Sequence, residues 1–226
     1  MVRLTLLYDT LLSPDFKGGW GFAAWLEVGE QQYLFDTGWN GFHLLHNIKK
    51  LNLDLSSLDG VFLSHEHWDH IGGLPNILEE VGGNDVPVWI PQSFSKKLQD
   101  DIAVYAKVVP VGDKPLEVAP GLWSTGQLPV PGQYSYLKEQ SAILPQPEGS
   151  IVVVGCSHPG LDTILDVADQ QGSVQAVVGG FHGFEKLDRL EQIPSILGIH
   201  CTKRKQEILD RFSQARSLLV GESIVW

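Results

Sequence analysis

The spacing of apolar residues predicts strands in the first part of the chain, followed by one amphipathic helix. Apolar and aromatic runs favour strands over residues 4–8, 20–28 and 32–35, and the glycines at 18–19 mark a turn between the first two. Residues 41–51 instead carry apolar side chains three or four positions apart, which is the spacing of one helical face. The chain therefore begins with a strand-rich segment.

The rest of the chain alternates predicted strands with predicted helices. Strands are predicted over residues 61–63, 86–90, 103–111, 122–125, 150–154 and 174–178, and helices over residues 74–81, 93–100, 160–169, 188–196 and 203–215. Together with the strand-rich beginning, this alternation predicts the α+β class: two β-sheets packed face to face with helices outside, an αββα four-layer sandwich. With 226 residues and 43% hydrophobic content, residues 1–226 are expected to form a single domain.

Charge and cysteine content narrow the classes of function. A formal net charge of −11 and a pI near 5.0 disfavour broad binding to nucleic acid or to an anionic membrane surface. No apolar run approaches the roughly 18 residues of a membrane-spanning helix. Two cysteines do not make a disulfide framework and fit a reducing compartment. We therefore expect a cytoplasmic protein that acts on a small molecule, without a nucleic-acid or membrane partner.

Candidate metal ligands are concentrated in one short stretch. His65, His67, Asp69 and His70 lie within six residues, directly after the predicted strand 61–63. His65 and His67 are two positions apart in extended backbone, so their side chains point to the same side. If the chain then turns into a helix, Asp69 and His70 swing toward a second point nearby. Because imidazole and carboxylate ligands together suit zinc, iron or manganese, the stretch predicts a site for two metal ions.

This His-x-His-x-Asp-His pattern after an apolar strand resembles the signature of the metallo-β-lactamase-fold hydrolases. Phe35-Asp-Thr-Gly38 precedes the signature and the isolated histidines His158 and His200 follow it, in the order of that superfamily. Three later segments resemble the subgroup named for the 7,8-dihydropterin-6-methyl-4-(β-D-ribofuranosyl)aminobenzene-5'-phosphate synthase of methanopterin biosynthesis: Val154-Gly-Cys-Ser-His-Pro-Gly160, Val178-Gly-Gly-Phe-His182 and Ile199-His-Cys-Thr202. The resemblance covers nearly the whole chain and implies the αββα sandwich of that superfamily.

The resemblance also implies how the ligands are shared between two metal ions. It assigns His65, His67 and His158 to the first ion. It assigns Asp69, His70 and His200 to the second, with Asp69 also acting in catalysis by orienting the attacking water. The implied cofactors are two divalent metal ions, zinc first, with manganese or iron as alternatives.

The sequence departs from the commoner superfamily pattern at one candidate ligand. Where many relatives place a metal-bridging aspartate, this chain has Gly155-Cys156. Cys156 fits a thiolate ligand, soft and suited to zinc, and it equally fits a small buried apolar residue. Asp36 is expected to accept a hydrogen bond from a ligand imidazole or to pin the signature loop. The alternative for Asp36 is a turn residue without a role in the site.

Two further sets of residues are candidates for contact with the substrate. His182 follows two glycines, which permit close backbone approach, and is expected to act as a general acid or anion binder, with a surface turn as the alternative. Trp68 lies inside the signature, and Trp39 with Trp20 or Trp25 fits a flat apolar wall at the substrate opening; core packing is the alternative for each.

The function that these residues favour is a dinuclear metal-dependent hydrolase. Its activated water would attack a phosphate ester, a lactone or a thioester. The subgroup resemblance adds a narrower hypothesis, transfer at a pterin diphosphate. One alternative is a mononuclear iron dioxygenase of the same fold, and another is a metal-binding or ligand-sensing module with little turnover. The sequence leaves the substrate, the physiological metal and the oligomeric state open.

Overall fold

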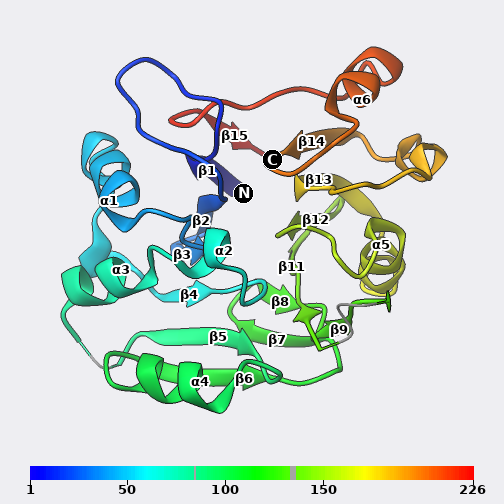
Figure 1. Ribbon diagram of the computed structural model, residues 1–226. Coiled ribbons are helices and arrows are strands. Elements are labelled where there is room, and N and C mark those ends of the chain that lie inside the picture. The colour runs from blue at the N-terminus through cyan, green and yellow to red at the C-terminus, as the bar shows by residue number, and fades with distance from the viewer. Residues whose placement is uncertain (84, 133–135) are drawn as a thin grey trace. The chain divides into compact units, whose positions relative to one another are not determined.

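The computed structural model describes residues 1–83, 85–132 and 136–226, and the chain divides into two compact units (Figure 1). Unit 1 comprises residues 1–112 and 219–226, and unit 2 comprises residues 113–218. Each unit contains one large β-sheet with its own helices and its own apolar core. That residues 1–226 form a single domain stays a prediction.

The described strands of the unit 1 sheet run in the order β15-β1-β2-β3-β4-β5-β6. They span Val2–Tyr8 (β1), Ala23–Val28 (β2), Gln31–Phe35 (β3), Gly60–Phe62 (β4), Pro87–Pro91 (β5), Lys107–Val111 (β6) and Ser223–Val225 (β15). β1, β2 and β3 pair antiparallel, whereas β3 to β6 pair parallel. Since neighbouring parallel strands end at the same edge of a sheet, the residues that follow β3 and β4 are brought together.

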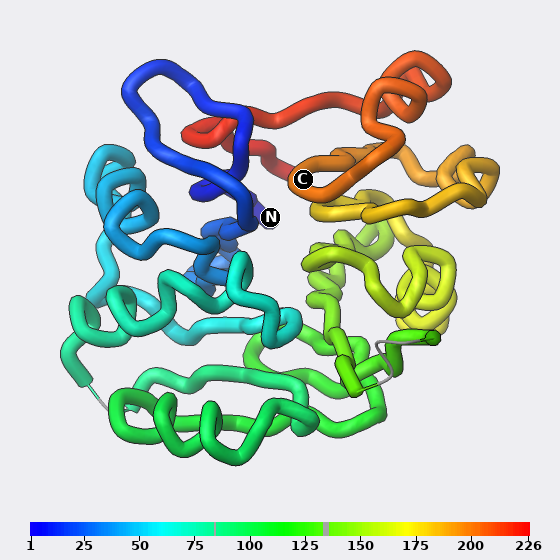
Figure 2. The backbone as a smooth tube through the Cα atoms, viewed as in Figure 1, coloured from blue at the N-terminus to red at the C-terminus, as the bar shows by residue number. Residues whose placement is uncertain are grey.

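The helices of unit 1 pack on this sheet. They span Gly41–Lys50 (α1), Leu55–Ser57 (the 3₁₀ helix η1), Trp68–Ile71 (α2), Leu74–Val81 (α3) and Lys96–Ala103 (α4). α1 begins at Asn40, whose side chain accepts the N–H of His43 at 3.2 Å, and it lies beside α3 (Figure 1). Figure 2 shows the loop between β1 and β2 passing along α1, where buried Asn47 donates to the carbonyls of Leu7 and Lys17.

The described strands of the unit 2 sheet run in the order β14-β13-β12-β11-β8-β7. They span Leu116–Ala119 (β7), Leu122–Ser124 (β8), Ala142–Gln146 (β11), Gly149–Val154 (β12), Val174–Gly180 (β13) and Ser195–Ile199 (β14), and a separate pair comprises Leu128–Pro129 (β9) and Lys138–Glu139 (β10). Its helices are Leu161–Asp169 (α5), Leu187–Leu190 (the 3₁₀ helix η3) and Lys205–Arg211 (α6). β12, β13 and β14 are parallel neighbours, so their carboxyl ends share one edge.

The structure corrects the predicted helix over residues 188–196. That segment forms only the short helix η3 and then the strand β14. Ile196 and Leu197 are fully buried and pair with Val177 and Val178 of β13, so burial on both faces of a parallel sheet outweighs the apparent helical spacing. The prediction also missed β7, β11 and β15, and the strand predicted over 103–111 starts only at Lys107 because α4 continues to Ala103.

No helix within the described part of the chain combines the length and the apolar character that crossing a membrane requires.

Candidate metal ligands

The four signature residues occupy the turn that leads from β4 into α2. His65 follows the strand and is fully buried, and His67 stands immediately before the first residue of the short helix α2. Asp69 and His70 lie inside that helix, where His70 is fully buried and Asp69 is 9% exposed. The predicted change from extended chain to helix within the signature is therefore confirmed.

Asp36, at the end of β3, ties both halves of the signature to one carboxylate. Its Oδ1 accepts the backbone N–H of Ser64 at 2.7 Å. Its Oδ2 accepts the Ser64 hydroxyl at 2.7 Å and the Nδ1–H of His70 at 2.6 Å. Both expected roles of Asp36 are present together, since it holds a candidate ligand imidazole and pins the signature loop.

These hydrogen bonds also determine which nitrogen of the His65 and His70 rings carries the proton and which carries the lone pair. The Ser64 hydroxyl donates to Asp36, so its oxygen accepts the Nδ1–H of His65, 2.9 Å away. His70 donates its own Nδ1–H to Asp36. Both rings therefore carry the lone pair on Nε2, which is the form that binds a metal ion.

The ligand atoms of the signature gather at short distances. His65 Nε2 lies 3.1 Å from His67 Nδ1, and His70 Nε2 lies 3.7 Å from Asp69 Oδ2. The rings of His65 and His70 have centroids 4.2 Å apart. Three imidazoles and a carboxylate, largely buried and close together, form the donor set that a transition-metal ion requires.

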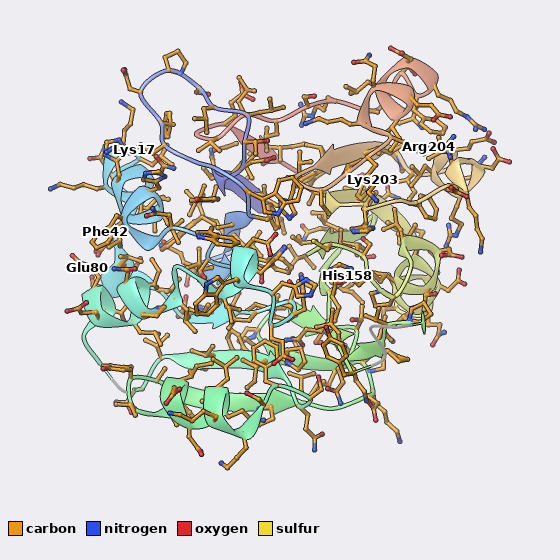
Figure 3. All side chains as sticks on the ribbon, in the orientation of Figure 1. Lys17, Phe42, Glu80, His158, Lys203 and Arg204 are labelled. Atoms are coloured by element: carbon orange, nitrogen blue, oxygen red, sulfur yellow. The ribbon has the colours of Figure 1, made fainter. Side chains whose placement is uncertain are left out.

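The candidate residues of unit 2 follow three adjacent parallel strands. His158 comes after β12, His182 after β13 and His200 after β14. The rings of His158 and His182 have centroids 5.2 Å apart. The backbone N–H of Lys203 donates to the His182 carbonyl at 2.9 Å. Figure 3 labels His158 and Lys203, which both belong to unit 2. The shared edge of β12, β13 and β14 brings the three histidine segments together.

Unit 2 also groups two sulfur atoms with one imidazole. The ligand atoms of Cys156, His200 and Cys201 all lie within 4.8 Å of one another. The two sulfurs are 3.3 Å apart, and Cys156 and Cys201 are 4% and 7% exposed. Cys201 was not predicted as a ligand; its position directly after His200 was the available signal.

Comparisons with known proteins bear on the fold of the chain. A family model described as the β-lactamase superfamily domain matches residues 31–125, a segment that contains Asp36 and the signature. A solved structure described as Tm1679, a metal-dependent hydrolase of the β-lactamase superfamily, superposes with a TM-score of 0.77 at 23% identity and covers 100% of this chain and 99% of its own. This chain has the metallo-β-lactamase fold. The predicted fold class is thereby confirmed.

Two curated relatives of this metallo-β-lactamase-fold protein come from the archaeon Methanocaldococcus jannaschii. One, named 7,8-dihydropterin-6-methyl-4-(beta-D-ribofuranosyl)-aminobenzene-5'-phosphate synthase, is 27% identical over 195 residues, which cover 68% of this chain and 66% of the synthase. The other is an uncharacterized protein, 24% identical over 252 aligned positions that cover 96% of both chains. The predicted resemblance to the synthase subgroup is therefore confirmed at the level of sequence similarity.

Three candidate residues in this metallo-β-lactamase-fold protein, and Ser157 beside Cys156, adopt the left-handed backbone region. The φ angles are 52° at Asp36, 60° at Ser157, 42° at His182 and 50° at His200. A residue other than glycine held in this region costs conformational energy, and such residues concentrate at functional sites. These left-handed residues are hard to predict from the sequence, because the only local signal of a tight turn is a neighbouring glycine.

His182 differs electrostatically from an ordinary surface histidine. Burial lowers its pKa from the usual value of 6.5, and the nearby positive charges of Lys203 and His200 lower it further. Its neutral form is therefore favoured. The side chain is half-buried rather than placed in a fully exposed turn.

One buried carboxylate beside the candidate ligands escaped the sequence analysis. Glu139, at the end of β10, accepts hydrogen bonds from the backbone N–H groups of Cys156, Ser157 and His158. Its neighbours in the sequence, Lys138 and Gln140, are polar and give no sign of burial, yet the Glu139 side chain is fully buried.

The donor chemistry of these residues fits divalent metal ions. Unit 1 supplies two imidazoles that carry their lone pairs on Nε2, and unit 2 supplies imidazole and sulfur atoms grouped within 4.8 Å. Nitrogen and sulfur ligands of this kind suit zinc, and nitrogen with carboxylate also suits manganese or iron.

Proposed function

We propose that this protein is a metal-dependent hydrolase with two divalent metal ions, zinc first, and manganese or iron as alternatives. The observation that carries the proposal is the hydrogen-bonded chain from Asp36 through Ser64 to His65, together with the bond from His70 to the same carboxylate. A buried carboxylate that fixes the tautomer of two neighbouring imidazoles is the usual support of metal-binding histidines.

We assign the ligands as the superfamily resemblance implies. His65, His67 and His158 bind one ion, and Asp69, His70 and His200 bind the other, with Cys156 as an additional thiolate ligand. The grouping of Cys156 with His200 within 4.8 Å supports a sulfur contribution to the second ion. The position of His158 and His200 after neighbouring parallel strands supports their pairing in one set of ligands.

The chemistry divides between the ions and the protein. Divalent ions held by these residues supply Lewis-acid chemistry, which activates water as a nucleophile near neutral pH and polarises a phosphoryl or carbonyl group. Asp36 keeps the proton on Nδ1 of His70 and so holds that ring in position. Asp69 orients the attacking water through its carboxylate, and His182 contacts the substrate beside His158.

The substrate class is a small molecule with a phosphate ester, lactone or thioester. The name of the archaeal relative, a phosphate synthase acting in dihydropterin chemistry, supports a narrower version in which the reaction is a transfer at a pterin diphosphate. The net charge of −11 supports a small-molecule partner over nucleic acid or an anionic membrane surface. A cytoplasmic location fits the two closely spaced thiols.

The decisive experiment combines metal analysis with an activity screen. Purified protein loaded with zinc or manganese is expected to bind two ions per chain and to hydrolyse at least one member of a panel of phosphodiesters, phosphomonoesters, lactones and thioesters. The double variant His65→Ala, His67→Ala should lose at least one ion. Retention of both ions by that variant would refute the ligand assignment.

A charge-removing variant tests the catalytic role of Asp69. Asp69→Asn keeps the shape of the side chain and loses its negative charge, so turnover is expected to fall by about 100-fold or more while the circular dichroism spectrum is unchanged. One bound iron with oxygen-dependent turnover would instead favour the mononuclear dioxygenase, and metal binding without any turnover would favour a binding module.

A further inference from the structure

Glu139 is a buried carboxylate that holds three consecutive backbone N–H groups. Its Oε1 accepts the N–H groups of Cys156 and Ser157, both at 2.9 Å, and its Oε2 accepts the N–H of His158 at 2.8 Å. The residue is fully buried at the end of β10 and comes from a part of the chain 17 residues before Cys156. Charge-assisted hydrogen bonds of this kind are among the stronger ones in proteins.

The segment that Glu139 holds is unusual in conformation. Ser157 has a φ of 60°, which places a residue other than glycine in the left-handed region. Consecutive N–H groups that point toward one centre form a concave binding place for an anion, and the Glu139 carboxylate occupies it. The Ser157 hydroxyl donates to the Gly180 carbonyl at 2.7 Å, which fixes the same turn to β13. The carboxylate and the hydroxyl together offset the strain of the turn.

This turn separates two proposed ligands. Cys156 and His158 stand on either side of Ser157, so the backbone conformation at residue 157 sets the directions in which their side chains leave the chain. A change in that conformation would move both proposed ligand atoms at once. Small displacements of ligand atoms weaken metal binding strongly, because coordination distances are narrow.

We propose that Glu139 is a positioning residue. It holds the backbone turn of residues 156–158, which carries the proposed metal ligands Cys156 and His158. The proposal rests on the proposed function, since it takes Cys156 and His158 as ligands. It assigns to Glu139 an action through backbone N–H groups, without contact to the metal ion or the substrate.

Two variants separate position from charge. Glu139→Gln keeps the size of the side chain but replaces one acceptor oxygen by an NH₂ group, which faces a backbone N–H and cannot accept from it. Glu139→Asp keeps the charge but shortens the side chain by one methylene, so its oxygens cannot reach all three N–H groups. If Glu139 acts through position, both variants lose affinity; if it acts only through its negative charge, Glu139→Asp behaves as the wild type.

The experiment measures zinc affinity of the full chain by competition with a chromophoric chelator, and amide hydrogen exchange of residues 156–158 in the metal-free protein. Both Glu139 variants are expected to bind zinc about 10- to 100-fold more weakly, the range seen when a partner of a metal ligand is removed. The amide hydrogens of residues 156–158 are expected to exchange faster in both variants. The exchange rates of the amide hydrogens in β12 and β13 are expected to stay unchanged.

Ser124→Ala is the matched control. Its hydroxyl donates to buried Gln140 at 2.7 Å and accepts the backbone N–H of Gly126 at 2.9 Å in the same unit, so Ser124→Ala removes two buried hydrogen bonds, neither of which involves residues 156–158. Its zinc affinity should equal that of the wild type even if its melting temperature falls.

Several results would overturn the proposal. Wild-type zinc affinity in Glu139→Gln, or in Glu139→Asp alone, excludes the positioning role. If both variants fail to fold while Ser124→Ala folds, Glu139 is a general folding residue and the proposal fails. If the wild type binds no zinc, the proposed function fails, and the hydrogen-exchange comparison still decides whether Glu139 holds the turn.

Discussion

The Asp36 side chain fixes the tautomer of two imidazoles, those of His65 and His70. Its carboxylate accepts a hydrogen bond from His70 directly, and it accepts one from the Ser64 hydroxyl, which in turn accepts one from His65, so both rings are held in one tautomer before any ion binds. The backbone around it contributes as well, because Thr37 donates both its N–H and its hydroxyl to the His70 carbonyl, at 2.7 Å and 2.9 Å. Asp36 and Thr37, in the turn after β3, therefore hold both ends of the signature by hydrogen bonds.

Replacement of Asp36 by asparagine tests this arrangement. The amide has one acceptor oxygen and a donating NH₂ group, so it cannot accept all the hydrogen bonds that Asp36 receives from Ser64 and His70. We expect Asp36→Asn to weaken metal affinity about 10- to 100-fold and to cost about 1–3 kcal/mol of unfolding free energy. Chelator competition and urea denaturation measure the two effects.

The control for that variant is Asp59→Asn on the same sheet. Asp59 accepts one backbone N–H, that of Gln32 at 2.7 Å, in an exposed position, so its replacement should change stability by no more than about 0.5 kcal/mol. Equal metal affinities of Asp36→Asn and the wild type would show that the hydrogen-bonded chain is not a metal-binding support.

Cys156 is the residue for which two roles, a thiolate ligand of a metal ion and a small apolar residue of the core, fit about equally well. Its sulfur is buried like that of a core cysteine, yet it lies 3.3 Å from the Cys201 sulfur and within 4.8 Å of a His200 nitrogen. A thiol must ionise to bind a metal, so metal binding should protect Cys156 from alkylation. We expect faster labelling of Cys156 in the metal-free protein than in the zinc-loaded protein, measured by peptide mapping.

The matched variants are Cys156→Ala and Cys201→Ala, which remove sulfurs of similar burial. If Cys156 is the ligand, its replacement weakens zinc binding more than that of Cys201. Equal labelling rates with and without zinc, together with unchanged affinity in Cys156→Ala, would mean core packing, with a stability cost of about 1 kcal/mol.

At the scale of elements, parallel strands decide where the candidate residues meet. Asp36 and the signature follow the parallel pair β3 and β4, and His158, His182 and His200 follow the parallel neighbours β12, β13 and β14. Glycines in β13 permit the close approach that this requires. A Cβ on Gly180 would stand 2.6 Å from both the Cys201 sulfur and the Gly155 carbonyl oxygen.

Gly180→Ala tests whether that close approach is needed. The added methyl group must displace backbone as well as a sulfur atom, so we expect a loss of about 1–3 kcal/mol in unfolding free energy and weaker zinc binding through displaced Cys156 and Cys201. Gly183→Ala is the control three residues later, where the nearest atom to the new methyl group is the Lys203 side chain at 4.0 Å. Equal urea midpoints for the two variants would contradict the prediction.

The sequence predicted the elements whose periodicity is strong and missed those defined by their neighbours. The first three strands, the helix after residue 40 and the signature turn were correct within a few residues, because each carries a clear local pattern. The helix predicted over residues 188–196 overlapped the start of β14, since Leu190, Ile193 and Ile196 have helical spacing and only pairing with β13 makes Ile196 part of a strand. β15 was missed because its partner, β1, lies at the other end of the chain.

The candidate site divides in the same way. Residues in a contiguous pattern, such as His65 and His70, could be predicted from spacing and from family resemblance. Glu139 could not, because its partners are the backbone N–H groups of a distant turn, which leave no trace in residue types. Core packing was the alternative given for four tryptophans; Trp39 and Trp68 are 52% and 62% exposed, whereas Trp25 is fully buried. Exposure of this kind depends on how loops are tied together and not on hydrophobicity.

At the scale of the whole molecule, metal binding and stability are linked. The chain carries 11 excess negative charges, and the signature concentrates unprotonated imidazole nitrogens, so a bound divalent ion relieves unfavourable interactions only in the folded state. An ion that binds the folded chain and not the unfolded chain stabilises it by mass action, by about 2.7 kcal/mol at a free concentration of 100 times Kd.

We therefore expect zinc at that concentration to raise the melting temperature of the full chain by roughly 5–10 °C, and excess chelator to reverse the shift. Calcium is the matched ion, because it carries the same charge but prefers oxygen ligands, and its shift should be much smaller. The double variant His65→Ala, His67→Ala should lose most of the zinc shift, measured from its own metal-free melting temperature. Equal shifts with zinc and calcium would mean that the ions only screen the negative charge, and the nitrogen-based metal site would have to be abandoned.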